Sequence, residues 1–257
     1  IFAALLWLIV GEPFLINFFE KGHLSWVPVH SLAIAKHSWL THGGLGFSCQ
    51  IQDGDGNIFY DYFNRYPVFF ALASKYMLLP FESNIAGWIY ASKQLMNIIF
   101  IANIFVLWQI CKGLKFSGWI AGAAVFASAS SEIVLRYKSM YHFDQPALLA
   151  YFICVLVVTR IYDSSLQKDW QLIAAVGIGS LIGRATIVIL FPIALAITNG
   201  SIGLLLKNEK KAIFVDRAKV SAKAAATGVA LTGMALLYNL SFEMRINKIG
   251  LSDTSIY

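Results

Sequence analysis

The sequence predicts an all-α integral membrane protein, a polytopic helical bundle of about seven transmembrane segments. Of the 257 residues, 58% are hydrophobic and only 13% are charged, whereas roughly a quarter of the residues of a soluble domain are charged. Several apolar runs approach or exceed the roughly 20 residues that cross a bilayer as a helix. Strands of about ten residues with alternating polarity, the pattern of a membrane β-barrel, are absent from the sequence.

The net charge and the cysteines exclude some other classes of function. The formal net charge is +6, but the lysines cluster between apolar segments, so topology and lipid headgroups account for them and nucleic acid is not an expected partner. Cys49, Cys111 and Cys154 form no CxxC pair, and we interpret the last two as small packing residues. Because the chain begins at Ile1 inside an apolar run, we expect residues 1–257 to be one transmembrane module of a longer chain.

The first part of the chain combines a membrane segment with a long polar loop. The segment is predicted over 1–19 and is interrupted at Pro13, which lacks a helical N–H donor, next to Glu12. The polar stretch 20–67 follows as the first outer loop. Within it, 27–42 is predicted to be a short amphipathic helix at the membrane interface.

The loop at 20–67 contains histidines and acidic residues that suggest a site. His23 and His30 are predicted either to form part of a polar interfacial stripe or to line an active-site cleft, and their spacing is not that of a metal pair on one helix. The run at 52–57 begins like a calcium loop but lacks the later ligands. We therefore interpret 52–57 as a tight, solvated turn.

Further membrane segments are expected after the loop, at 68–79, 95–111, 116–135, 144–162, 171–199 and 222–240. The first of these is short for a spanning helix unless it begins around Tyr62. Asp144 and Gln145, which precede Pro146, are predicted to be the N-cap and first residue of the segment at 144–162.

The run at 171–199 leaves two alternatives open. It is either one long kinked helix or two shorter elements that meet at Arg184. A charged residue inside such a run is costly in lipid, so Arg184 is expected to face a cavity or an anionic partner.

A basic linker gives the strongest indication of topology. Before the last segment it carries Lys207, Lys210, Lys211, Arg217, Lys219 and Lys223, and this excess of positive charge places the linker in the cytoplasm. The loop at 20–67 then lies on the outer face if 171–199 crosses the membrane once. If that run crosses twice, the loop lies on the opposite face.

Three blocks of the sequence carry a resemblance to a known superfamily: GHLSWVPVH at 22–30, YDYFNRYPVFF at 60–70 and KSMYHFDQPAL at 138–148. With the apolar first segment and the long loop that follows it, they resemble the N-terminal module of the GT-C glycosyltransferases. Relatives in that superfamily include protein O-mannosyltransferases and lipid A aminoarabinose transferases. The blocks themselves are most similar to those of uncharacterised bacterial membrane proteins classed with glycosyltransferases, and the resemblance covers nearly the whole chain.

The resemblance implies an activity and a location. A sugar would pass from a polyprenyl-phosphate donor to an acceptor on the outer face of the bacterial inner (plasma) membrane, and some branches of the superfamily use a divalent cation. The catalytic carboxylates would be Glu20 and Asp61. Basic groups that bind the donor phosphate would be Arg65, Lys138 and Arg184. Further substrate-binding candidates would be His23, His30, His142 and Asp144.

One departure from the superfamily keeps other functions open. The superfamily usually has aspartate just after the first helix, whereas this chain offers Glu12 and Glu20. A second hypothesis is therefore a catalytically silent scaffold subunit with partner subunits in a larger membrane complex. A third is a transporter, which the glycine-interrupted run around Arg184 suggests.

Overall fold

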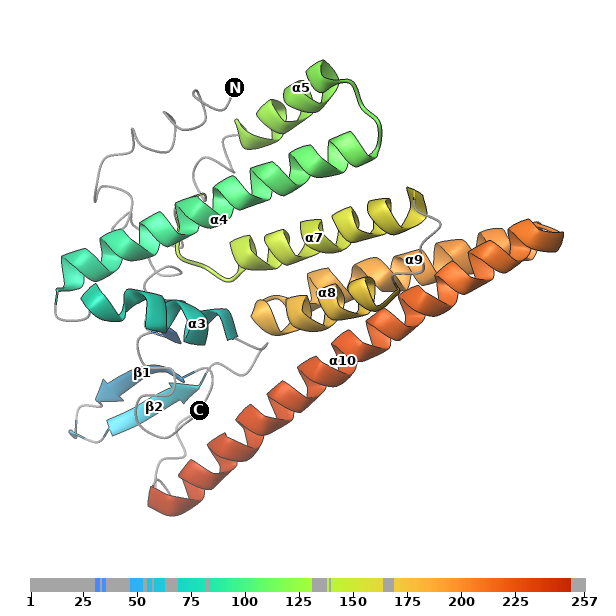
Figure 1. Cartoon of the computed structure of the whole chain (residues 1–257). Coiled ribbons are helices and arrows are strands. Elements are labelled where there is room, and N and C mark those ends of the chain that lie inside the picture. The colour runs from blue at the N-terminus through green and yellow to red at the C-terminus, as the bar shows by residue number, and fades with distance from the viewer. Residues whose placement is uncertain are drawn as a thin grey trace.

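The computed structural model describes most of the chain after residue 68 and short stretches before it (Figure 1). The described residues are 31–32, 34–35, 47–52, 55–56, 58–62, 69–81, 84–130, 138, 140–163 and 169–250. Their elements are β1 (Phe47–Gln52), β2 (Ile58–Tyr62), α3 (Phe69–Leu78), η2 (Leu79–Phe81), α4 (Ile85–Gly113), α5 (Gly118–Ala129), α7 (Asp144–Asp163), α8 (Asp169–Ile182), α9 (Ala185–Leu205) and α10 (Asn208–Gly250).

Four helices are long and apolar enough to cross a membrane. They are α4, α7 over Asp144–Ile161, α9, and α10 over Glu209–Ser241. The chain is therefore a membrane protein built mainly of helices, while the predicted number of seven segments stays a prediction. α3, α5 and α8 are apolar but have only 10, 12 and 14 residues. At 1.5 Å per residue they are about 15 to 21 Å long, against a hydrocarbon core of roughly 30 Å.

The predicted segment at 68–79 corresponds to a helix that is too short to cross a bilayer. Tyr62 belongs to β2, and α3 begins only at Phe69. α4 begins after Asn84, whose side-chain oxygen accepts hydrogen bonds from the backbone N–H groups of Ala86 and Gly87 at 3.0 and 3.2 Å. These bonds satisfy donors that would otherwise be unpaired at a helix start. The expected segment at 95–111 lies within this helix.

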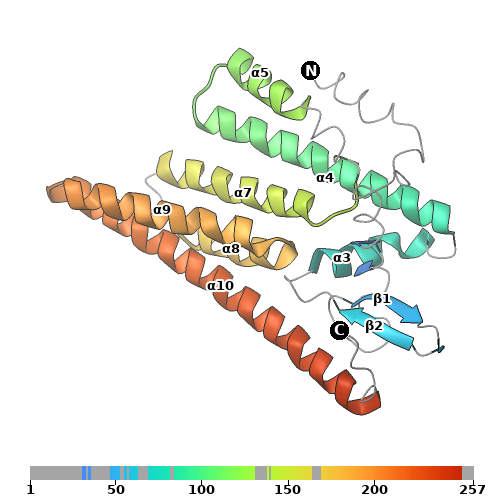
Figure 2. The ribbon, with the colours of Figure 1, turned by 180° about the vertical axis from the view of Figure 1, so that it is seen from behind.

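The run at 171–199 forms two helices. α8 ends at Ile182 and α9 begins at Ala185, so the alternative in which two elements meet at Arg184 is confirmed. Pro192 lies inside α9 without ending it. The two helices run in opposite directions beside one another in both views (Figures 1 and 2).

The basic stretch before residue 222 is helical, so its prediction as a linker is wrong. α10 is one continuous helix of 43 residues. The stretch 208–223 contains neither glycine nor proline and is rich in lysine and alanine, which are strong helix formers. Its charges therefore lie on a helix that continues into the last apolar segment.

A two-stranded hairpin is the part of the fold that the all-α prediction missed. β1 and β2 pair antiparallel, with Gln52 opposite Ile58. The turn between them was predicted: Asp55 and Gly56 are exposed, and Gly56 has a φ of 86°, which glycine adopts readily. Of the predicted interfacial helix at 27–42, residues 31–32 and 34–35 are helical and buried, and the rest lies outside the described residues.

Two large hydrophobic cores and a small one, which packs Phe100 of α4 against Ala129 of α5, hold the described helices together. The first joins α3, the first half of α4 and the residues just before α7, and it includes Leu78, Met96 and Phe143. The second joins α7, α8, α9 and α10 and includes Val176 and the buried Cys154. Cys111 is also buried, so both cysteines expected to be packing residues are confirmed as buried.

Glycines allow the helices of the second core to approach closely. A Cβ atom at Gly179 of α8 would lie 3.0 Å from the Cβ of Ala150 on α7. At Gly228 of α10 it would lie 3.0 Å from Cγ1 of both Val176 on α8 and Ile189 on α9. Small residues at crossings bring helix backbones together, which favours packing inside a membrane.

Gly228→Leu is therefore expected to destabilise the bundle by about 1–3 kcal/mol, the usual cost of overpacking. The measurement is the thermal unfolding midpoint of the purified protein in lipid nanodiscs. Gly233→Leu is the matched control on the same helix, because nothing lies within 4 Å of a Cβ atom there. Equal losses in the two variants would contradict the packing argument.

Candidate functional site

The candidate site lies where the start of α7 meets the turn between α8 and α9 (Figures 1 and 2). A Cβ atom at Gly183, in that turn, would lie 2.7 Å from the carbonyl oxygen of Phe143. The same oxygen accepts a hydrogen bond from the N–H of Ala147 at 3.2 Å, so it is fixed as the first acceptor of α7. Glycine alone permits this approach, and the approach brings Arg184 to the start of α7.

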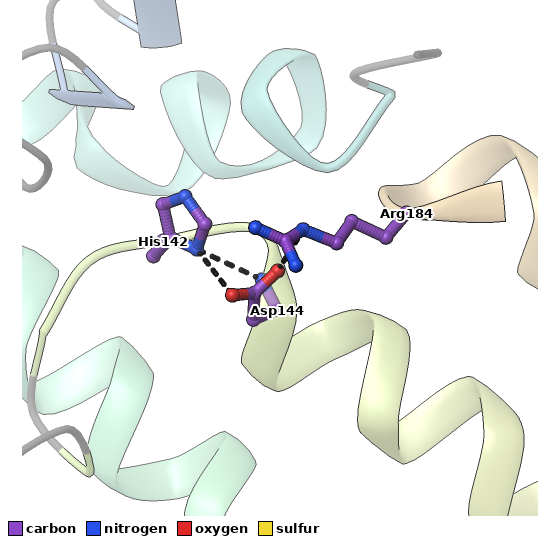
Figure 3. Close-up of polar contacts among 3 residues, drawn as sticks. All are labelled: His142, Asp144 and Arg184. Carbon is purple, nitrogen blue, oxygen red and sulfur yellow. Dashed lines mark hydrogen bonds and ion pairs between the residues drawn. The ribbon is translucent and has the colours of Figure 1, made fainter. Parts of the chain in front are cut away.

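Asp144 lies between a guanidinium and an imidazole (Figure 3). Nε of Arg184 is 2.6 Å from Oδ1 of Asp144, and Nδ1 of His142 is 3.1 Å from Oδ2. The contact with Arg184 is an ion pair rather than an aligned hydrogen bond, because Oδ1 has no hydrogen-bond partner of good geometry. Through its contact with Arg184, the Asp144 carboxylate thus links the start of α7 to the start of α9.

Asp144 does not have the capping role predicted for it. The carbonyl of Phe143 already accepts the first intrahelical hydrogen bond of α7, which makes Phe143 the N-cap and places Asp144 in the first turn. The predicted boundary is off by one residue, within the usual uncertainty of helix ends. The carboxylate of Asp144 is turned toward His142 and Arg184. Asp144 therefore contacts the other two residues of the candidate site and does not cap the helix.

The exposure of this cluster limits what it contributes to stability. The side chains of Arg184 and Asp144 are 48% and 45% exposed, and that of His142 is 17% exposed. Ion pairs with this much access to solvent typically contribute about 0–1 kcal/mol. The close approach at Gly183 positions these charges, while the charges themselves remain reachable from outside the fold.

His142 makes two contacts with Asp144 that need different protonation states. The backbone N–H of Asp144 points at Nδ1 of His142 over 3.3 Å, a bond that requires Nδ1 without a proton. The carboxylate contact at the same Nδ1 is favoured when that nitrogen carries a proton. Nδ1 of His142 thus faces both the backbone N–H and the carboxylate of Asp144.

The residue before His142 anchors it to α3. Tyr141 is fully buried, and its ring stacks on that of Phe70 with centroids 5.7 Å apart. The hydroxyl of Ser74 donates to the carbonyl of Ala71 at 3.0 Å, so the hydroxyl of Tyr141 donates to Ser74. Burial raises the pKa of the Tyr141 phenol well above its usual range, and the group stays neutral.

A polar contact with α4 fixes the other side of the helix start. Nδ2 of the buried Asn103 donates to the carbonyl oxygen of Gln145 at 3.3 Å and to its Oε1 at 3.2 Å. Interhelical hydrogen bonds of this kind hold membrane helices in register. The residues that surround Asp144 in sequence are thus tied to α3 and α4.

The structure brings together three of the residues predicted for the site: His142, Asp144 and Arg184. Lys138 is buried, with 3% of its surface exposed. Asp61 lies in β2 opposite Cys49, and its side chain is not described. The predictions for Glu20, His23, His30 and Arg65 lie outside the described residues.

Sequence reasoning did not find the residues that support the cluster. Gly183 and Tyr141 stood next to predicted site residues, but nothing in the sequence showed that Gly183 approaches Phe143 or that Tyr141 reaches α3. Two further lysines, Lys75 on α3 and Lys93 on α4, are each 7% exposed.

The expected divalent cation finds no ligand set in the part of the chain that is described. No group of three or more His, Cys, Asp or Glu side chains there is arranged to hold a metal ion. Glu20 and the side chain of Asp61 lie outside that part, so the cation stays a prediction.

No protein-family model matches the chain, and comparisons with curated proteins and with solved structures return no match. The site itself therefore carries the functional argument.

Gly183→Ala is expected to cost about 1–3 kcal/mol of stability, because its Cβ would meet backbone that cannot rotate away. It should also separate Arg184 from Asp144. Asp144→Asn alone is then expected to lower the free energy of unfolding by less than about 1 kcal/mol. In the Gly183→Ala background it is expected to cause no further loss, because the contact with Arg184 is already broken. A double-mutant cycle of thermal unfolding in nanodiscs measures this coupling.

Gly200→Ala is the control for this cycle, because a Cβ atom there has nothing within 4 Å. If Gly183→Ala behaves like Gly200→Ala, the close approach does not position the site.

Proposed function

We propose that this chain is a membrane glycosyltransferase module that takes a sugar from a polyprenyl-phosphate donor. The observation that carries the proposal is the cluster of His142, Asp144 and Arg184, at the point where α7 and α9 begin. The resemblance of the sequence to the GT-C superfamily supplies the reaction class. The cluster supplies a half-exposed cation that suits a lipid-linked phosphate.

Arg184 is the proposed phosphate ligand. Its contact with Asp144 uses Nε, so the four N–H groups on its two Nη atoms can serve a phosphate in a forked arrangement. The N-terminal ends of α7 and α9 lie beside it, and helix N-termini favour anions. Asp144 orients the guanidinium and offsets its charge when no donor is bound.

The remaining roles follow from the chemistry of glycosyl transfer. The acceptor hydroxyl loses a proton as the bond between sugar and phosphate breaks, and the lipid phosphate leaves as an anion. The resemblance gives the proton-accepting role to Glu20, with Asp61 beside it. His142 lies beside Asp144, where its imidazole would donate a hydrogen bond to the departing phosphate.

The proposed orientation places this site on the outer face of a bacterial inner membrane. The turn between α9 and α10 is rich in lysine, which favours the cytoplasm. α9 is long and apolar enough to cross the membrane, so a cytoplasmic turn at its end would put its start, beside Arg184, on the outer face. The outer location of 20–67 belongs to the same proposal.

Arg184→Gln tests the phosphate role. Loss of charge-assisted hydrogen bonds is expected to weaken donor binding about 10- to 100-fold. The assay follows sugar release from polyprenyl-phospho-sugars by the purified protein in proteoliposomes. Arg160→Gln, at the other end of α7 where Arg160 is exposed, is the matched control and should retain wild-type transfer.

Two results would count against the proposal in different ways. Wild-type donor binding by Arg184→Gln would remove Arg184 from the phosphate site. A folded wild-type protein that transfers no sugar from any polyprenyl-phospho-sugar, and that co-purifies with stoichiometric partners, would favour the scaffold hypothesis.

A further inference from the structure

The turn between α9 and α10 is a second surface with its own chemistry, at the opposite end of the bundle from Asp144. α9 ends at Leu205 and α10 begins at Asn208. The exposed side chains there are apolar at first and then basic: Leu204 and Leu205 are 80% and 85% exposed, and Lys207, Lys210 and Lys211 are exposed. Glu209 is the single acid from 204 to 213, so this stretch carries a net charge of +2.

The length of α9 indicates how deep this turn lies. α9 has 21 residues and is apolar enough to cross a membrane, and at 1.5 Å per residue it is about 31 Å long, close to the thickness of the hydrocarbon core. Its last residues, Leu204 and Leu205, therefore lie at the edge of that core, and Lys207 lies just beyond it.

The headgroups of a bilayer add roughly 5–7 Å on each side of the hydrocarbon core. Leucines at the edge of the core would meet the part of the acyl chains nearest the headgroups. Lysines just beyond that edge would meet phosphates, and the stems of their side chains can lie along apolar surface.

The start of α10 is held against α9 in this layer. A Cβ atom at Gly203 would lie 3.3 Å from Cγ2 of Val215 and 3.6 Å from Cβ of Phe214. The guanidinium carbon of Arg217 lies 5.5 Å from the centroid of the Phe214 ring. The lysines of the turn are thus presented by two packed helices.

We propose that this turn binds the headgroups of anionic phospholipids in the leaflet opposite the candidate active site. The apolar side chains at Leu204 and Leu205 seat the acyl chains, and the lysine ammonium groups at 207, 210 and 211 contact the phosphates. This inference does not depend on glycosyl transfer, because it concerns the other end of the bundle.

The test compares lipid association in nanodiscs made from zwitterionic phosphatidylcholine doped with spin-labelled phosphatidylglycerol. Each basic residue near an anionic surface raises the preference for anionic over zwitterionic lipid roughly fivefold. The triple variant K207Q/K210Q/K211Q is therefore expected to lower the relative association constant of phosphatidylglycerol by one to two orders of magnitude. K207R/K210R/K211R should keep the wild-type value.

Lys112→Gln with Lys115→Gln removes charges from the last turn of α4 and from the turn after it, and serves as the control for a diffuse charge effect. The proposal holds if the control keeps the preference and the Lys→Gln triple variant loses it. The proposal is overturned if the Lys→Gln triple variant keeps the preference for phosphatidylglycerol. It is also overturned if the control variant loses as much of that preference as the triple variant does.

Discussion

The contact between Gly183 and the backbone of Phe143 is the constraint on which the candidate site depends. It joins the start of α7 to the break between α8 and α9, at the edge of the hydrophobic core that these three helices share. Because the ion pairs at Asp144 are half-exposed, their own energy is too small to hold this geometry. Tight backbone packing sets the position, and the charges are left accessible for binding.

The helices were predictable to the extent that local composition determines them. The run at 171–199 contained its own break, since glycine and arginine interrupt an apolar pattern at 183–184. The start of α10 was missed because its lysines suggested a solvated linker. Lysine and alanine favour helix wherever no glycine or proline intervenes, and α10 extends over both kinds of sequence. The hairpin was missed because two strands of six and five residues give little periodic signal.

The site was predictable only in its charges. Arg184 was chosen because a charged residue inside an apolar run is costly in lipid, and His142 and Asp144 were chosen because their block of sequence resembles that of proteins classed with glycosyltransferases. The hydrogen bond from Tyr141 to Ser74 spans 67 residues of sequence, and the one from Asn103 to Gln145 spans 42. Such contacts depend on how helices pack, which no local pattern encodes, so the supporting residues emerge only from the three-dimensional arrangement.

The continuity of α10 has a mechanical consequence. α10 is one helix of 43 residues without a break, and it packs against α9 through Val215 and against α8 and α9 through Gly228. These two positions of α10 are 13 residues, or about 20 Å, apart along its axis. Because no loop separates them, a shift of the α9–α10 turn along this axis would reach the contact at Gly228 through helix backbone alone.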